Sequence, residues 1–83
     1  MRAKIFVKLK ASVLDPQGKT IHQAVQTLGY RGIEDIRQGK YFEIALSDSL
    51  TRDEAWAMLD RLAREVLSNP VIEEYRVELE ETS

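Results

Sequence analysis

The stretch of sequence that decides the fold is residues 33–46, which read IEDIRQGKYFEIAL. Its second half alternates in polarity as a half-buried strand does, with one side formed by Phe42, Ile44 and Leu46. We predict a strand over 40–46 and a shorter one over 33–37. The dipeptide Gln38-Gly39 between them is typical of a tight hairpin turn, so the two strands are expected to pair antiparallel.

On the N-terminal side of this stretch, the pattern predicts a strand and then a helix. Residues 3–9 alternate strictly between apolar and polar side chains. Asp15-Pro16 is typical of a helix start, with Asp15 as the N-cap, and Gly29 of a helix end. An apolar stripe with helical spacing lies between them and is predicted to face the core: Ile21, Ala24, Val25 and Leu28.

On the C-terminal side, a second helix and a last strand are predicted. Thr51 and Glu54 have the spacing of a capping box, and Asn69-Pro70 ends the helix. Residues 71–80 then alternate as a strand. The predicted core stripe of this helix consists of Ala55, Met58, Leu59, Leu62 and Val66.

The order of elements is therefore βαββαβ within a single domain, residues 1–83. This order predicts an α+β, ferredoxin-like fold, with a four-stranded antiparallel sheet and two helices on one face. The first strand would lie in the middle, beside the last. Its lysines would then face the glutamates of the last strand, in cross-strand pairs that contribute about 0.2–1 kcal/mol each.

The composition excludes several classes of protein. The chain has no cysteine, which excludes disulfides and thiolate metal sites. A net charge of −2 argues against a nucleic-acid-binding domain. No apolar run approaches the roughly 20 residues that span a bilayer, and the N-terminus lacks the pattern of a signal peptide. We expect a cytoplasmic domain.

One face of the predicted sheet is left bare by the helices, and Phe6 and Tyr41 point to it. Isolated exposed aromatic side chains are common, but these residue types are also enriched in subunit interfaces. RNA-recognition motifs stack bases on aromatic residues of the same strands, although the acidic charge disfavours that use here. We predict a homo-oligomer, dimer or higher, whose interface includes Phe6, Arg37, Lys40 and Tyr41.

The sequence offers no group of residues with the spacing of a catalytic, cofactor or metal site. His22 is the only histidine, and Asp15 is explained as a helix cap. Gly18-Lys19-Thr20 resembles the end of a phosphate-binding loop but lacks its first glycine and preceding strand. We therefore predict a chain that is not an enzyme on its own.

Four segments, in order, carry a resemblance to a known family: VLDPQG (13–18), LG (28–29), RQGKYFE (37–43) and NPVIE (69–73). With these segments the chain resembles the PurS family, the small subunit of phosphoribosylformylglycinamidine (FGAM) synthase. The resemblance covers essentially the whole length.

The resemblance implies a role in de novo purine biosynthesis, within an ATP-dependent ligase complex. In that complex a glutaminase subunit, PurQ, releases ammonia and a synthase subunit, PurL, uses it. The implied role of the small subunit is to bridge the two and to assist ammonia transfer. It binds no cofactor itself, although the complex uses ATP. The alternative, from the shared order of elements, is a ligand-sensing regulatory module similar to ACT domains.

Overall fold

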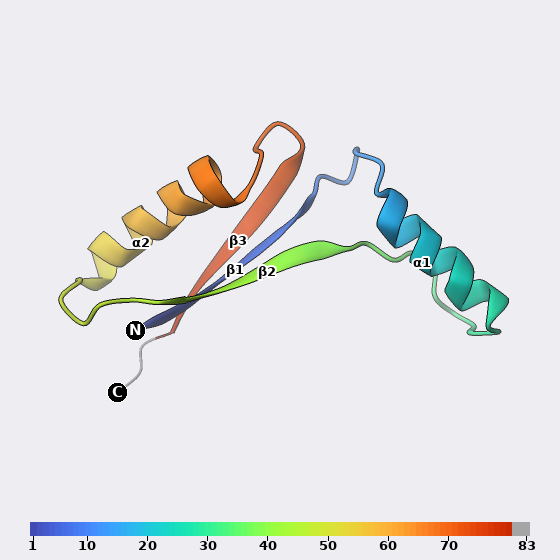
Figure 1. The fold of residues 1–83 in the computed structure, drawn as a ribbon, viewed down its shortest axis with the longest axis horizontal. Coiled ribbons are helices and arrows are strands. Elements are labelled where there is room, and N and C mark those ends of the chain that lie inside the picture. The colour runs from blue at the N-terminus through green and yellow to red at the C-terminus, as the bar shows by residue number, and fades with distance from the viewer. Residues whose placement is uncertain (81–83) are drawn as a thin grey trace.

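A computed structural model of the chain describes residues 1–80, so the last three residues of the predicted domain lie outside the described part (Figure 1). Its elements are β1 (Arg2–Leu9), α1 (Pro16–Thr27), β2 (Gly39–Ala45), α2 (Arg52–Leu62), the π-helical turn η1 (Ala63–Leu67) and β3 (Glu73–Glu80).

Within residues 1–80 the sheet has three antiparallel strands in the order β2-β1-β3. The predicted central position of the first strand beside the last is confirmed. Alternation places Ala3, Ile5 and Val7 on one face of β1, where none is more than 1% exposed. Leu59 and Ala63 pack on them from α2 and η1 and form the core. The opposite face of the sheet, which α2 does not cover, is called the open face below.

The predicted four-stranded, ferredoxin-like sheet is wrong. Residues 33–37 form no strand and do not turn back, and β2 begins at Gly39, opposite Lys8 of β1. Two-residue hairpin turns of the favoured types need a positive φ, but among the described residues positive φ occurs only at Gly29 and Gly32. A side chain at Gly39 would place its Cβ 2.6 Å from the carbonyl oxygen of Val7. Glycine is therefore required at this position by close strand approach, not by a turn.

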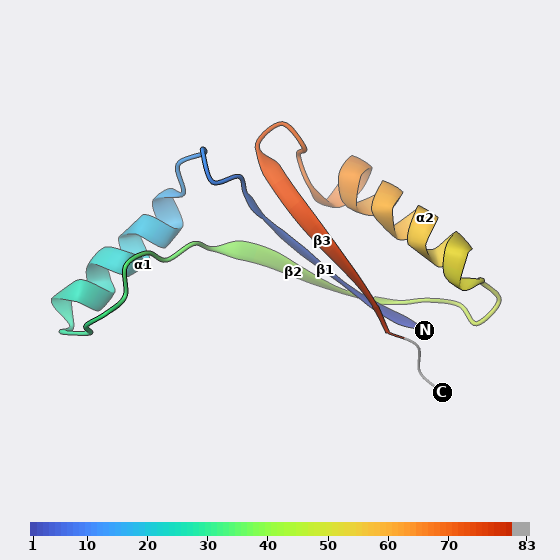
Figure 2. The same cartoon turned by 180° about the vertical axis from the view of Figure 1, so that it is seen from behind.

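The predicted placement of both helices on one face is also wrong. The predicted bounds of α1 are confirmed, with Asp15 as the N-cap and Gly29 at φ 91°. However, α1 projects beyond the end of the sheet, away from α2, on a segment formed by residues 10–38 (Figures 1 and 2). We call this segment the arm. The α1 stripe predicted to be buried is consequently exposed, Ile21 by 43% and Leu28 by 75%.

The arm gives the molecule an extended shape. Its principal extents are 51 × 30 × 14 Å, and its radius of gyration is 16.4 Å. A compact domain of this length has a radius of gyration of about 12 Å. The chain as a monomer is therefore much less compact than an independent globular domain.

The second helix follows the prediction at its start and departs from it in its stripe. Thr51 Oγ1 accepts a hydrogen bond from the backbone N–H of Glu54 at 3.2 Å, which confirms the N-cap. Ala55 and Leu59 are buried as predicted, but Met58 is 42% exposed and Val66 69% exposed. Ala63, four residues after Leu59, is buried, and across the π-helical turn η1 Leu67 packs against the core in place of Val66.

Candidate interaction site

The base of the arm is fixed to the sheet end by the carboxylate of Asp15, which is only 7% exposed. One oxygen, Oδ1, accepts a hydrogen bond from the backbone N–H of Gly18 at 3.0 Å. The other, Oδ2, accepts one from the backbone N–H of Gln38 at 2.7 Å. These two hydrogen bonds, and to a lesser degree the charge of Arg37, lower the pKa of Asp15.

Arg37, in the segment of the arm that leads back to β2, also holds this junction. Its Nη2 donates to the carbonyl oxygens of Leu9 at 3.3 Å, Lys10 at 2.9 Å and Val13 at 3.1 Å. Gly18 is buried here, and a Cβ on it would collide with the carbonyl oxygen of Ile36. The segment that leaves the sheet and the segment that returns to it are thus held together at the base of the arm. Arg37, predicted to be an interface residue, therefore has a structural role.

The open face has an aromatic centre. Phe6 and Tyr41 lie opposite each other on β1 and β2, with ring centroids 5.1 Å apart. The guanidinium carbon of Arg76, from β3, lies 4.6 Å from the centroid of the Phe6 ring, within the range of a cation–π contact. Tyr41 is 47% exposed and its hydroxyl donates to Glu43 at 3.1 Å.

Charged side chains surround this centre and pair with one another, as predicted from the charges of the first and last strands. Lys4 Nζ lies 3.0 Å from Glu80 Oε1, and Lys8 Nζ lies 3.5 Å from Glu74 Oε1. The hydrogen bond and the charge of Glu80 raise the pKa of Lys4. These charges are satisfied within the chain, so the open face does not need a charged partner.

The four predicted interface residues do not form one site. Phe6 and Tyr41 are brought together on the open face. Lys40 alternates with Tyr41, so it lies on the opposite face of the sheet, where its Nζ is 3.9 Å from Glu73 Oε2. Arg37 belongs to the junction of the arm. That these residues form an interface stays a prediction.

Sequence analysis missed the exposed apolar surface of the arm. Besides Ile21 and Leu28, its exposed large side chains include Leu14 at 66% and Tyr30 at 63%. The composition of α1 could have indicated this surface. With histidine counted as neutral, Lys19 is the only charged residue of α1, whereas 31% of the residues in the chain are charged. Depletion of charge is characteristic of interface centres.

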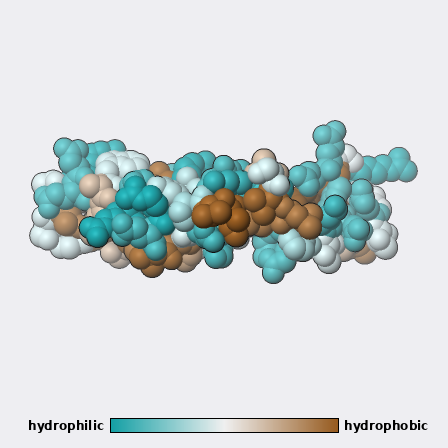
Figure 3. Space-filling model, turned by 90° about the horizontal axis from the view of Figure 1, so that it is seen from above, coloured by the Kyte–Doolittle hydropathy of each residue, from teal (hydrophilic) through white to brown (hydrophobic). Residues whose placement is uncertain are grey.

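The loops at the end of the sheet expose further apolar side chains. Val71 is 77% exposed and Ile72 is 40% exposed, and the carbonyl oxygen of Ile72 accepts a hydrogen bond from Lys10 N at the base of the arm. Figure 3 shows apolar side chains gathered in a band across the middle of the molecule in this view. Val71, predicted to lie in the last strand, precedes β3.

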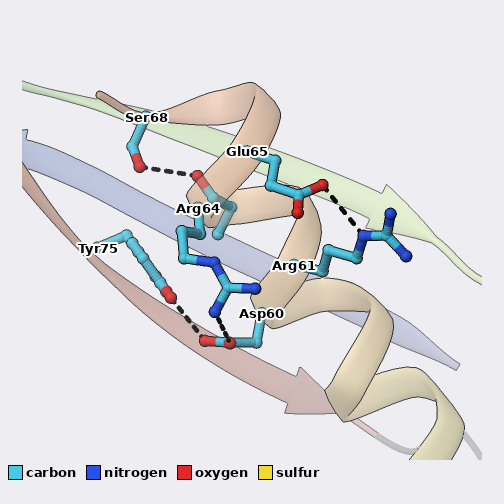
Figure 4. A network of polar contacts seen from close by, with 7 residues as sticks. Asp60, Arg61, Arg64, Glu65, Ser68 and Tyr75 are labelled. Carbon is cyan, nitrogen blue, oxygen red and sulfur yellow. Dashed lines mark hydrogen bonds and ion pairs between the residues drawn. The ribbon is translucent and has the colours of Figure 1, made fainter. Parts of the chain in front are cut away.

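A network of polar contacts lies where α2 and η1 meet β3. Tyr75 of β3 donates from its hydroxyl to Asp60 Oδ1 at 2.6 Å, and Asp60 also pairs with Arg64 at 3.3 Å (Figure 4). The hydrogen bond to Asp60, followed by burial, raises the pKa of Tyr75. This network ties α2 and η1 to β3, and it explains their charged outer surface without a ligand.

A hollow of about 500 Å³ beside the arm is lined by residues 11–15 and 34–37, together with Lys19 and His22. Its histidine is already engaged, because His22 Nε2 lies 2.8 Å from the carbonyl oxygen of Ile33, which can only accept a hydrogen bond. In the described part of the chain, no group of three or more acidic, histidine or cysteine side chains could hold a metal ion. Nor does any helix there have the length and apolarity needed to span a membrane.

The fold and these surfaces define a small α+β protein whose distinctive feature is a projecting arm with exposed apolar side chains. A family model described as "PurS: Phosphoribosylformylglycinamidine (FGAM) synthase" matches residues 2–81. The chain belongs to the PurS family.

Individual relatives agree with this assignment. The FGAM synthase subunit PurS of Bacillus subtilis is 40% identical over 80 residues, covering 96% of this chain and 93% of the relative. The crystal structure of Methanocaldococcus jannaschii PurS has a TM-score of 0.86 and 27% identity, and the match covers 99% of this chain and 98% of that one. A chain in the structure of PurLQS from Thermotoga maritima has a TM-score of 0.71 and 25% identity, with 93% of each chain covered.

Proposed function

We propose that this chain is the PurS subunit of an FGAM synthase, in which it bridges a PurQ glutaminase and a PurL synthase subunit and assists ammonia transfer between them. The observation that carries the proposal is the family match over residues 2–81. The structure of PurLQS from Thermotoga maritima, which contains a similar chain, supports the choice of partners. The ACT-like alternative is not favoured, because the match to PurS runs through the whole described fold.

The architecture is suited to a bridging role. Lys4, Lys8 and Asp60 are engaged in internal ion pairs, and the arm and the loop at residues 70–72 expose apolar side chains. Ammonia reacts as the neutral molecule, which is the minor form at neutral pH. A subunit that seals the path between two active sites would keep ammonia away from bulk water. We place the complex in the cytoplasm, and we propose that PurS acts there as a homo-oligomer.

The experiment that tests this function is reconstitution with PurQ and PurL of the same organism. FGAM formation is measured with glutamine and, separately, with ammonium as the nitrogen source. We expect glutamine-dependent synthesis to require all three subunits, and ammonium-dependent synthesis by PurL to persist without this chain. Glutamine-dependent synthesis that is unchanged when the chain is omitted would refute the proposed role.

A further inference from the structure

Two loops lie side by side at the end of the sheet from which the arm projects: the loop after β1 and the loop before β3 (Figures 1 and 2). The backbone N–H of Lys10 in the first loop donates a hydrogen bond to the carbonyl oxygen of Ile72 in the second at 2.9 Å. Leu14 of the first loop, like Val71 and Ile72 of the second, has an exposed apolar side chain. We call the surface formed by these four residues the crest; Figure 3 views the molecule from the side on which these loops lie.

Internal hydrogen bonds fix both loops of the crest. In the second loop, Asn69 Oδ1 accepts from the backbone N–H of Val71 at 3.1 Å, and the backbone N–H of Asn69 donates to Glu73 Oε1 at 2.7 Å. In the first loop, Arg37 donates to two backbone carbonyl oxygens. A surface that is already ordered loses little conformational entropy when a partner covers it. The crest is therefore preorganised for binding.

The apolar side chains of the crest have no role in the core of the described residues. The core cluster, with the partly buried side chains that pack against it, includes none of Leu14, Val71 and Ile72. Single exposed apolar residues are common on protein surfaces. Here three of them lie on two loops that are bonded to each other, so together they form a continuous apolar centre that a partner can cover.

The charges at the strand ends beside the crest leave one lysine over. Lys8 pairs with Glu74 at 3.5 Å, and Lys40 pairs with Glu73 at 3.9 Å. The side chain of Lys10 forms no ion pair within residues 1–80. Apolar centres surrounded by a polar rim, with complementary charges, are characteristic of protein interfaces. A partner that fits the crest therefore has apolar side chains opposite the two loops and a carboxylate opposite Lys10.

We infer that the crest is the docking site for a subunit other than a second copy of this chain, and that the docked surface of that subunit is apolar with a carboxylate that reaches Lys10. A second copy placed crest to crest would bring its own Lys10 to the same contact, and like charges there would repel. In the complex proposed above, the docked subunit is one of the two partners, PurL or PurQ. The inference rests on the proposed function and adds to it the surface that makes the contact.

Removal of the apolar side chains tests the centre of the crest. The variant carries Leu14→Gln with Val71→Gln, and Met58→Gln, at an exposed position of α2, is the control. Binding of the full chain to PurL, to PurQ and to their mixture is measured by sedimentation velocity. We expect the double variant to bind one of the two subunits at least tenfold more weakly than the parent, and the control to bind as the parent does. Circular dichroism confirms that each variant is folded.

Reversal of the charge tests the rim. Lys10→Glu should weaken binding to the same subunit and make it less dependent on salt concentration, because the partner's carboxylate would then face a like charge. Arg31→Glu makes the same change in net charge on the far part of the arm and is the control.

Parent-like binding of both crest variants to PurL, to PurQ and to the mixture overturns the inference, as does a parent chain that binds none of them. A crest variant whose free form differs in mass from the parent also overturns it, because the crest would then belong to a contact between copies. The proposed function fails separately. Crest variants that bind like the parent in a complex that makes FGAM from glutamine refute only the docking surface, whereas unchanged synthesis without the chain refutes the function.

Discussion

The carboxylate of Asp15 and the backbone N–H of Gln38 are joined by a 2.7 Å hydrogen bond across 23 positions of sequence. The first residue caps the helix of the arm, and the second is the last residue before β2. A single side chain therefore starts the helix and fixes the point at which the chain returns to the sheet. We therefore expect the orientation of the arm to depend on this contact.

Replacement of Asp15 by Asn tests the contact with little change in shape. The amide can still accept from Gly18 as an N-cap, but its NH₂ group would face the N–H of Gln38. We expect lower stability at pH 7, measured by urea unfolding. The folded pKa of Asp15 is lowered, so its stabilising effect is present above the unfolded pKa of about 3.9 and is lost as the pH falls toward the folded value. The difference between the two chains should therefore shrink below about pH 4; a constant difference would contradict the assignment.

Arg37→Lys tests whether the guanidinium holds the junction. Lysine keeps the charge but lacks the planar, five-donor group that here reaches three carbonyl oxygens. We expect a loss of about 1–2 kcal/mol in unfolding free energy and faster amide hydrogen exchange in residues 10–15. Arg31→Lys on the exposed part of the arm is the control. Unchanged exchange at residues 10–15 would show that Arg37 is dispensable there.

Gly39→Ala tests the reason for glycine at the start of β2. Because the added Cβ would lie 2.6 Å from the Val7 carbonyl oxygen, β1 and β2 would have to separate. We expect a cost of about 1–3 kcal/mol in urea unfolding. Gly32→Asn is the control, since φ is +83° there, space is open and asparagine tolerates this conformation. Equal stability of the Gly39→Ala chain and the parent would rule out the close approach.

Phe6→Glu with Tyr41→Lys tests the prediction that the open face mediates self-association. The introduced charges would be desolvated in an interface, which should split the oligomer. The fold should survive, because Arg76 already lies over position 6 and can pair with the new carboxylate. Light scattering is the measurement, after circular dichroism confirms folding. A folded variant with the parent's mass would move the interface away from this face.

Much of the local structure was predictable from sequence because it depends on residues a few positions apart. The cap at Asp15, the end of α1 at Gly29 and the cap at Thr51 are interactions within one helical turn. The alternation of residues 3–9 correctly placed Phe6 and the buried Ile5 on opposite faces. The pairing of Lys4 and Lys8 with the last strand followed once the order of strands was inferred. The four matching segments likewise carried the family assignment.

The course of residues 33–38 and the position of α1 were decided only by the tertiary structure. An extended segment before glycine has the same sequence signature whether it turns back as a hairpin or continues into the next strand. Here the hydrogen bonds of Asp15 and Arg37 to backbone groups distant in sequence make the segment continue into β2. The stripe of Ile21 and Leu28 likewise indicates that a helix buries one face, but not against which surface. Hydrophobic burial is non-directional, so the pattern is the same whether the surface that covers it belongs to the same chain or to another.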